Sequence, residues 1–410
     1  MMNLHDTPEE AAFRRSARAW IAANRFDAVT MESLKGLAAN GTPLPSPDLW
    51  RLAREWNARK YDAGYAVLTW PQEYGGRDAP NLATIFAEEE GVLARFQGYL
   101  VITQFMCAAT LMAFASPAQK ADLLPRIARA DDIWCQMFSE PGAGSDLAAV
   151  RTRAERVEGG WRINGQKVWT SGAHMAQWGT LLTRTDPSVP KHKGLTMFYL
   201  RMDTPGVTVR PIELMSGEAE FNEVFFDDVF IPDDQRLGAV GAGWKAAVVT
   251  LNSERMAIGA MLDVDTGALV DLACETGAIA QDAVRQKLAD WIIAERGLRA
   301  CVARQLTSIA EGRTPGPEAG TVKLVGGVMI EDMAAYALDL LESQGLALPP
   351  GRHRHRIYRD MFHFGPAQRA AGGSDEVLKN VLAERVLGLP QEDRPDNRMA
   401  FSDIPTAPKG

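Results

Sequence analysis

Two short stretches of the chain combine residue types that can bind a polar ligand. The first reads Ser-Glu-Pro-Gly-Ala-Gly-Ser-Asp over residues 139–146, and the second reads Lys-Val-Trp-Thr-Ser over residues 167–171. Glycines let a backbone approach a flat ligand closely, and exposed N–H groups bind polar edges or phosphates. Either stretch alone fits a glycine-rich turn or a core tryptophan better, so the prediction of a ligand site depends on the pair.

A third candidate for chemistry is the carboxylate of Glu254. Helical spacing places one stripe of residues on a common face: Ala247, Leu251, Glu254, Ile258 and Met261. A carboxylate on an apolar stripe is costly to bury unless it is paired or functional. Glu254 is therefore a candidate general base, and a structural ion-pair network with Arg255 is the alternative interpretation.

Together these residues resemble the acyl-CoA dehydrogenase family, in the order that the family uses. The Trp-Pro-Gln-Glu-Tyr-Gly-Gly segment at 70–76 is similar to the family's W-P-x-E-Y-G-G segment, and the resemblance runs from about Thr7 to Pro390. It points to bacterial FadE-like members with the base at the isovaleryl or long-chain position. The implied fold is α+β: a helical N-terminal domain (1–130), a β-barrel-like flavin and acyl-CoA domain (131–241), a C-terminal four-helix bundle (242–390) and a tail (391–410).

The reaction implied by this resemblance needs a cofactor. Desaturation of a thioester needs a base at the α-carbon and a hydride acceptor at the β-carbon, and no protein side chain accepts a hydride. The family's cofactor is FAD, and the resemblance implies that Phe138 and Ser139 face the pyrimidine edge of the flavin while Ser171 reaches its hydride-accepting nitrogen. The full set of implied FAD contacts is Gln136, Phe138, Ser139, Gly144, Ser145, Trp169, Thr170, Ser171 and Ser374.

The base position departs from the commonest family pattern. The matching C-terminal stretch is Ala-Gly-Gly-Ser-Asp-Glu over residues 371–376, and Gly372 stands where many members have the catalytic glutamate. Glycine has no carboxyl group, so the resemblance leaves Glu254 as the predicted catalytic base. The implied acyl-CoA contacts are Ser145, Asn252, Arg255 and the backbone of Gly372.

The implied activity is FAD-dependent α,β-dehydrogenation of an acyl-CoA to the trans-2-enoyl-CoA, with electrons passed to an electron-transferring flavoprotein. Such reactions belong to fatty acid or steroid side-chain degradation, and the acyl group stays open between branched, long-chain and steroid types. Residues 272–278, around Cys274, lack the arginine that family homodimers lend to a neighbour's FAD. Either the flavin phosphates are held differently in a homo-oligomer, or the chain forms a heteromer with a related subunit. A non-catalytic partner subunit and a flavin monooxygenase or oxidase on the same fold remain alternatives.

Composition excludes several other classes of protein. A net charge of −8 argues against a nucleic-acid partner. There is no apolar run of ~20 residues, so no membrane span is expected. The four cysteines are scattered, which favours reduced thiols in a cytoplasmic protein over disulfides or a zinc site. The basic run from Arg352 to Arg356 reads as a solvated loop.

The elements that must position these residues follow from local patterns. Capping boxes begin helices at Thr7 and Ser116. The Asn164-Gly165 pair predicts a β-hairpin turn within a small antiparallel β domain. Strands are predicted over 180–183, 195–200 and 224–226, and long helices over 244–264, 283–310, 321–341 and 375–387.

Overall fold

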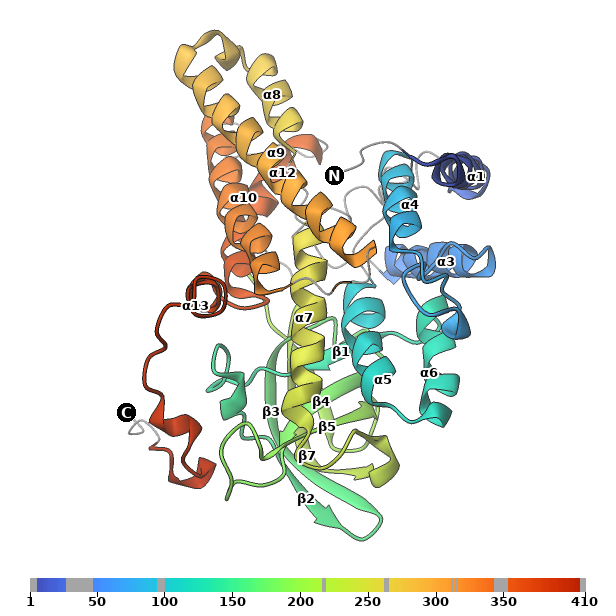
Figure 1. The fold of residues 1–410 in the computed structure, drawn as a ribbon, viewed down its shortest axis with the longest axis vertical. Coiled ribbons are helices and arrows are strands. Elements are labelled where there is room, and N and C mark those ends of the chain that lie inside the picture. Colours follow the sequence, from blue (N-terminus) through green and yellow to red (C-terminus); the bar gives the residue numbers. More distant parts are fainter. Residues whose placement is uncertain are drawn as a thin grey trace. The chain divides into compact units, whose positions relative to one another are not determined.

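The computed structural model describes residues 6–26, 47–93, 100–215, 219–261, 265–310, 313, 316–342 and 353–405. Contacts divide the chain into two compact units (Figure 1). The helical unit comprises residues 1–99 and 255–389, and the sheet unit comprises residues 100–254 and 390–410. This division groups the N-terminal helices with the C-terminal bundle. The domain bounds predicted from the sequence stay predictions.

The helical unit is formed by amphipathic helices from both ends of the chain. The capping box predicted at Thr7 is confirmed, since Thr7 and Glu10 exchange backbone-to-side-chain hydrogen bonds of 2.8 and 3.2 Å. The helices are α1 (Pro8–Asn24), α3 (Pro47–Asp62), α4 (Pro80–Leu93), α8 (Thr266–Glu275), α9 (Asp282–Ala310), α10 (Gly320–Leu341), α12 (His353–Ala370) and α13 (Asp375–Arg385). Among the described residues, their buried faces form one cluster around Trp56 of α3 and another around Trp291 of α9.

The sheet unit combines short helices with a mixed sheet. Its helices are a π-helix (Val101–Cys107), α5 (Ala108–Phe114), α6 (Pro117–Arg129) and the first part of α7 (Gly243–Met261). Its strands are β1 (Trp134–Met137), β2 (Arg153–Val157), β3 (Gly160–Ser171), β4 (Trp178–Arg184), β5 (Leu195–Arg201), β6 (Val207–Pro211), β7 (Phe221–Pro232) and β8 (Arg236–Leu237). The order is β6-β7-β3-β2-β4-β5-β8, with β1 parallel to β4. The capping box at Ser116 is confirmed at the start of α6.

The hairpin turn predicted at Asn164-Gly165 is wrong by six residues. The chain turns at 158–159, between β2 and β3, and Asn164-Gly165 lies inside β3. A register shift against β7 falls between Ile163 and Gly165, so the pair forms a bulge. A Cβ at Gly165 would stand 2.5 Å from the Thr152 hydroxyl, so this position needs glycine for close approach of the backbone.

The predicted loop around the basic run is also corrected. His353 begins α12, and the ring of Tyr358 and the imidazole of His355 are buried. Tyr358, Ile357 and Met361 pack in the cluster with α10, which outweighs the local concentration of charge. The side chains of Arg352, Arg354 and Arg356 lie outside the described residues.

The segment predicted as a tail is packed on the sheet unit. Short 3-10 helices form at Pro395–Asn397 and Phe401–Asp403, and the Phe401 ring is buried. Ala400 forms an isolated β-bridge with Pro190, in the loop that joins β4 to β5. The C-terminal segment therefore belongs to the structure of the sheet unit (Figure 1, red).

Candidate functional site

The two motif stretches lie side by side in the sheet unit. The N–H of Val168 donates to the carbonyl of Ser139 at 2.9 Å, which connects β3 to the chain leaving β1. The Lys167 ammonium donates to the carbonyl of Phe138 at 2.9 Å and to the Glu140 carboxylate at 2.8 Å. The two motif stretches, which the sequence analysis treats as one candidate site, thus contact each other directly through residues 138–140 and 167–168.

Lys167 and Glu140 form a buried ion pair that the sequence analysis did not single out. Lys167 is fully buried, and Glu140 also accepts the N–H groups of Arg151 and Thr152 at 2.6 and 2.8 Å. Burial acts to raise the pKa of Glu140, but Lys167 and these donors outweigh it and hold the pKa below its usual value. Burial lowers the pKa of Lys167 to about 8 against the opposing effect of Glu140. Each partner thus stabilises the charged form of the other against the cost of burial.

Trp169 stands out from β3 at a bulge. The register against β7 shifts between Lys167 and Thr170, and Trp169 has a φ of 61°, which is unusual for a residue with a side chain. The indole is 57% exposed and meets the Phe221 ring edge-on at 5.9 Å. A strained backbone that presents a large aromatic ring to solvent is typical of a binding surface.

The bulge turns the hydroxyl of Thr170 inward. Thr170 is buried, and its Oγ1 atom has no hydrogen-bond partner in the protein. The fully buried Asn222 side chain fixes the backbone here, since its amide donates to the carbonyls of Thr170 and Glu220 at 2.9 and 3.1 Å. His174 contacts the Asn222 oxygen at 3.0 Å. Ser171 follows at the end of β3 and is half-buried. No pattern in the sequence indicated Asn222.

Glu254 lies on α7 within reach of β1. The Gln136 amide nitrogen is 3.4 Å from the Glu254 carboxylate, a long hydrogen bond between residues 118 positions apart. A carboxylate accepts and does not donate, so the amide nitrogen faces it. The Gln136 oxygen Oε1 is left buried without a partner. The predicted base and a predicted flavin contact thus meet in one unit.

The stripe predicted around Glu254 is described only in part. Ala247 is fully buried, while Leu251 and Glu254 are half-buried and Asn252 is exposed. The side chains of Arg255, Ile258 and Met261 lie outside the described residues, so their predicted roles stay predictions.

The glycine-rich loop is open. Gly144 and Ser145 are exposed, and a Cβ placed on Gly142 or Gly144 would meet nothing within 4 Å. Phe138 is buried and Ser139 is half-buried at the start of the loop. The loop therefore leaves free space above its backbone, where a ligand can approach.

Gly372 and Ser374 belong to the helical unit. Gly372 has a φ of 64°, and the Ser374 hydroxyl accepts the N–H of Val377 at 3.4 Å as the N-cap of α13. Lys323 of α10 is 1% exposed and donates to the carbonyls of Arg369 and Gly373 at 2.9 and 2.8 Å. The sequence did not single out Lys323, which holds the backbone of this glycine turn.

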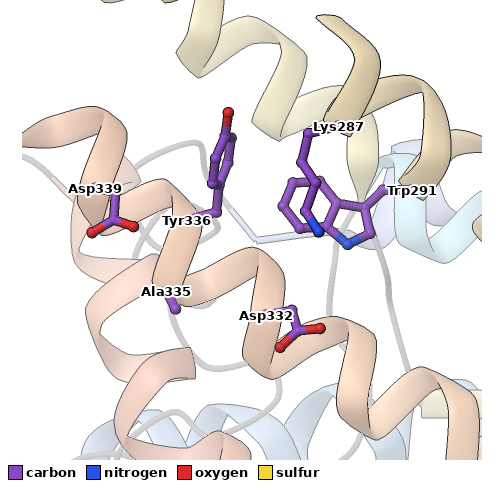
Figure 2. A pocket seen from close by; sticks show the side chains of 6 residues that line it. All are labelled: Lys287, Trp291, Asp332, Ala335, Tyr336 and Asp339. Atoms are coloured by element: carbon purple, nitrogen blue, oxygen red, sulfur yellow. The ribbon is translucent and has the colours of Figure 1, made fainter. Parts of the chain in front are cut away.

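A shallow hollow on α9 and α10 contains none of the predicted site residues (Figure 2). Its lining residues are Lys287, Trp291, Asp332, Ala335, Tyr336 and Asp339. The Lys287 ammonium lies 4.7 Å from the Trp291 ring centroid, so the protein's own cation covers the aromatic wall. The hollow is therefore explained by packing within the helical unit.

The described residues contain neither a cluster of metal ligands nor a membrane-spanning helix. No group of three or more histidine, cysteine, aspartate or glutamate side chains among them could hold a metal ion. Within the same part of the chain, no helix is long and apolar enough to cross a membrane.

Family models for three acyl-CoA dehydrogenase domains match the chain in succession. The N-terminal domain model matches residues 7–131, the middle domain model 135–229, and the C-terminal domain model 241–387. The three matches cover most of the chain in the order that the sequence motifs suggested.

Three similar proteins match the chain over nearly their whole length. Acyl-CoA dehydrogenase IpdE1 of Mycobacterium tuberculosis is 38% identical over 388 residues, 93% of this chain and 98% of that protein. The solved Tcur3481-Tcur3483 steroid ACAD has a TM-score of 0.81 at 26% identity, covering 95% of this chain and 100% of its own. The ChsE4-ChsE5 complex from Mycobacterium tuberculosis has a TM-score of 0.77 at 26% identity, covering 95% and 100%.

Proposed function

The chain belongs to the acyl-CoA dehydrogenase family, and from this premise we propose that it dehydrogenates a ring-bearing or branched acyl-CoA with Glu254 as its base. Acyl-CoA dehydrogenation is the activity of the family. The observation that carries the assignment of the base is the contact between Glu254 and Gln136, because it brings a carboxylate to the strand that bears the predicted flavin contacts.

The residues of the sheet unit fit a flavin. Two buried oxygens, Thr170 Oγ1 and Gln136 Oε1, have no protein partner and suit a ligand with both donor and acceptor groups. Trp169 offers an exposed aromatic ring, and the open loop at Gly144 offers backbone space. FAD, when bound, supplies the hydride acceptor that no side chain provides. Ser139, Ser145 and Ser171 would hold its polar edges, and the contact that the resemblance implies for Ser374 stays a prediction.

The protein's own part in the reaction is removal of a proton. The Glu254 carboxylate takes the proton from the α-carbon of the thioester as a general base. Gln136 donates to this carboxylate across 3.4 Å, which orients it. Ser145 and Asn252 would contact the acyl-CoA, and the contacts that the resemblance implies for Arg255 and the backbone N–H of Gly372 stay predictions.

A bulky acyl group is supported by the glycine at position 372. Where many members carry a glutamate side chain, this chain carries a single hydrogen atom, which leaves volume for a branched or ring-bearing substrate. A similar solved structure is described as a steroid ACAD. We therefore include the steroid type among the acyl groups of the proposal, in a cytoplasmic degradation pathway.

The substrate class is tested by anaerobic bleaching of the flavin with matched acyl-CoAs. Ring-bearing and branched acyl-CoAs are expected to reduce the flavin with a second-order rate constant about 10-fold or more above that of a short linear one, because a short chain leaves part of the pocket unfilled. A preference for the short linear acyl-CoA would contradict the proposed substrate class. Rapid consumption of oxygen by the reduced flavin would instead favour the monooxygenase or oxidase alternative.

The proposed assembly is a heteromer with a related subunit, with electrons leaving to an electron-transferring flavoprotein. The missing arginine near Cys274 supports a neighbour that differs from this chain. Two similar solved structures carry paired names, Tcur3481-Tcur3483 and ChsE4-ChsE5. The same features support a second candidate, in which this chain is the non-catalytic subunit of such a pair.

Thr170→Val is expected to weaken FAD binding about 2- to 13-fold. One net hydrogen bond contributes about 0.5–1.5 kcal/mol, and the Thr170 hydroxyl has no protein partner to lose. The flavin-free variant should therefore keep its stability within about 0.5 kcal/mol. Fluorescence titration with FAD and urea unfolding measure the two quantities.

Thr183→Val is the matched control for this substitution. The Thr183 hydroxyl is also buried in the sheet, but it donates to the carbonyl of Thr196 at 3.2 Å. This variant should lose about 1 kcal/mol of stability and bind FAD normally. Equal effects of both variants on FAD affinity would argue against a contact at Thr170.

A further inference from the structure

The C-terminal segment is attached to the loop that joins β4 to β5. The Phe401 ring is 6% exposed, and the guanidinium carbon of Arg184 lies 3.7 Å from the ring centroid. The N–H groups of Phe401 and Ser402 donate to the carbonyls of Val189 and Pro187 at 3.0 and 2.9 Å. A buried aromatic anchor and two backbone hydrogen bonds fix the segment at this place.

Lys191 connects this segment to the glycine-rich loop. Its ammonium is 2.6 Å from the Asp396 carboxylate and 2.8 Å from the Asp146 carboxylate, and its side chain is 7% exposed. Asp146 is the last residue of the Ser-Glu-Pro-Gly-Ala-Gly-Ser-Asp stretch. Because the Lys191 side chain is largely shielded from water, its ion pairs are stronger than those between fully exposed side chains.

Arg184 holds the chain immediately after this loop. It is almost fully buried and donates to the carbonyls of Ala148 and Val150 at 2.5 and 3.2 Å. It also donates to the carbonyl of Lys191 at 2.8 Å. The arginine that stacks on Phe401 therefore also fixes the exit of the glycine-rich loop.

We propose that residues 395–403 brace the glycine-rich loop in its ligand-binding shape, with Asp396, Lys191 and Phe401 as positioning residues for the flavin site. Within the loop, Glu140 and Ala143 exchange two backbone hydrogen bonds, while Pro141, Gly142, Gly144 and Ser145 are exposed. A loop with so much exposed backbone depends on how its ends are held. The identity of the ligand rests on the proposed function, but the brace itself does not.

The brace is tested with Asp396→Asn in the full chain. This variant keeps the shape of the side chain and removes the charge that Lys191 binds. Hydrogen exchange of the backbone amides of residues 142–150, in flavin-free protein, should rise about fivefold, and FAD affinity should fall by a similar factor. Asp396→Glu, which restores the carboxylate, should recover most of both losses.

Asp393→Asn is the matched control, because Asp393 pairs with Arg398 on the same segment and both side chains are well exposed. It should leave loop exchange and FAD affinity at wild-type values. Phe401→Ala removes the anchor and should act in the same direction as Asp396→Asn.

Two results would overturn the brace. One is that the backbone amides of residues 142–150 exchange at the wild-type rate in both Asp396→Asn and Phe401→Ala. The other is exchange that rises equally across the whole sheet unit, which would indicate general destabilisation. If loop exchange rises as expected but the protein never binds flavin, the proposed function is contradicted and the brace is still supported.

Discussion

Glu254→Gln should reduce the rate of flavin reduction by an acyl-CoA about 10²- to 10⁴-fold. Loss of a general base typically has this effect, which corresponds to roughly 3–5 kcal/mol of transition-state stabilisation. Glutamine preserves the size of the side chain and removes the basic oxygen pair, so FAD content and acyl-CoA binding should stay close to wild type. Anaerobic stopped-flow absorbance measures the reduction directly, and equilibrium titration measures the two affinities.

Glu223→Gln is the matched control for this experiment. Glu223 lies on β7 in the same unit and accepts a glutamine amide, that of Gln166, at 2.7 Å, much as Glu254 accepts Gln136. Its loss should leave flavin reduction unchanged. If Glu254→Gln reduces its flavin at the wild-type rate with a good substrate, the base lies elsewhere or on another subunit. The non-catalytic subunit would then become the better assignment.

The identity of the candidate base could be read from the sequence, but its surroundings could not. The family resemblance points to Glu254, and so does helical spacing, because a period of 3.6 residues can be recognised from the local sequence alone. The contact with Gln136 joins residues 118 positions apart, and it depends on where α7 crosses β1. Nothing in the local sequence around either residue encodes that crossing.

The errors in the fold have a related origin. Asn164-Gly165 is a strong local turn signal, yet β3 continues through it because the pairing with β7 places a bulge there. The basic run at 352–356 predicted a loop, yet Tyr358 and its neighbours pack with α10 and make the segment helical from His353. In both places tertiary packing outweighed a local preference. Where the signal was a complete capping box, as at Thr7 and Ser116, the prediction was confirmed.

The ion pair between Lys167 and Glu140 shows the same limit at the site itself. Both residues stood in the two motif stretches, but their types alone gave no reason to pair them across 27 positions. Burial is what makes the pairing necessary, because an ammonium without exposure needs a counter-ion. The pair joins the two stretches and so sets the spacing of the predicted flavin contacts.

Lys167→Met should therefore destabilise the protein by about 3–5 kcal/mol at pH 7. Removal of one partner leaves the Glu140 carboxylate buried with the N–H groups of Arg151 and Thr152 but without its ion-pair partner. Urea unfolding of flavin-free protein, followed by tryptophan fluorescence, measures the loss. FAD affinity should fall as well, because Phe138 loses the donor to its carbonyl.

The dependence of this loss on pH separates charge from packing. In the wild type the pKa of Glu140 is lowered, so its contribution to stability is present above the usual carboxyl pKa and is lost as pH falls through the lowered value. In Lys167→Met the buried carboxylate has lost its cation and gains from protonation. The difference in unfolding free energy between the wild type and Lys167→Met should accordingly shrink as pH falls toward about 4.

A double variant, Lys167→Met with Glu140→Gln, removes both charges and keeps an acceptor oxygen. It should recover at least about 1 kcal/mol of the lost stability at pH 7. A loss that is the same at every pH and is not recovered in the double variant would mean that Lys167 acts through packing of its aliphatic chain.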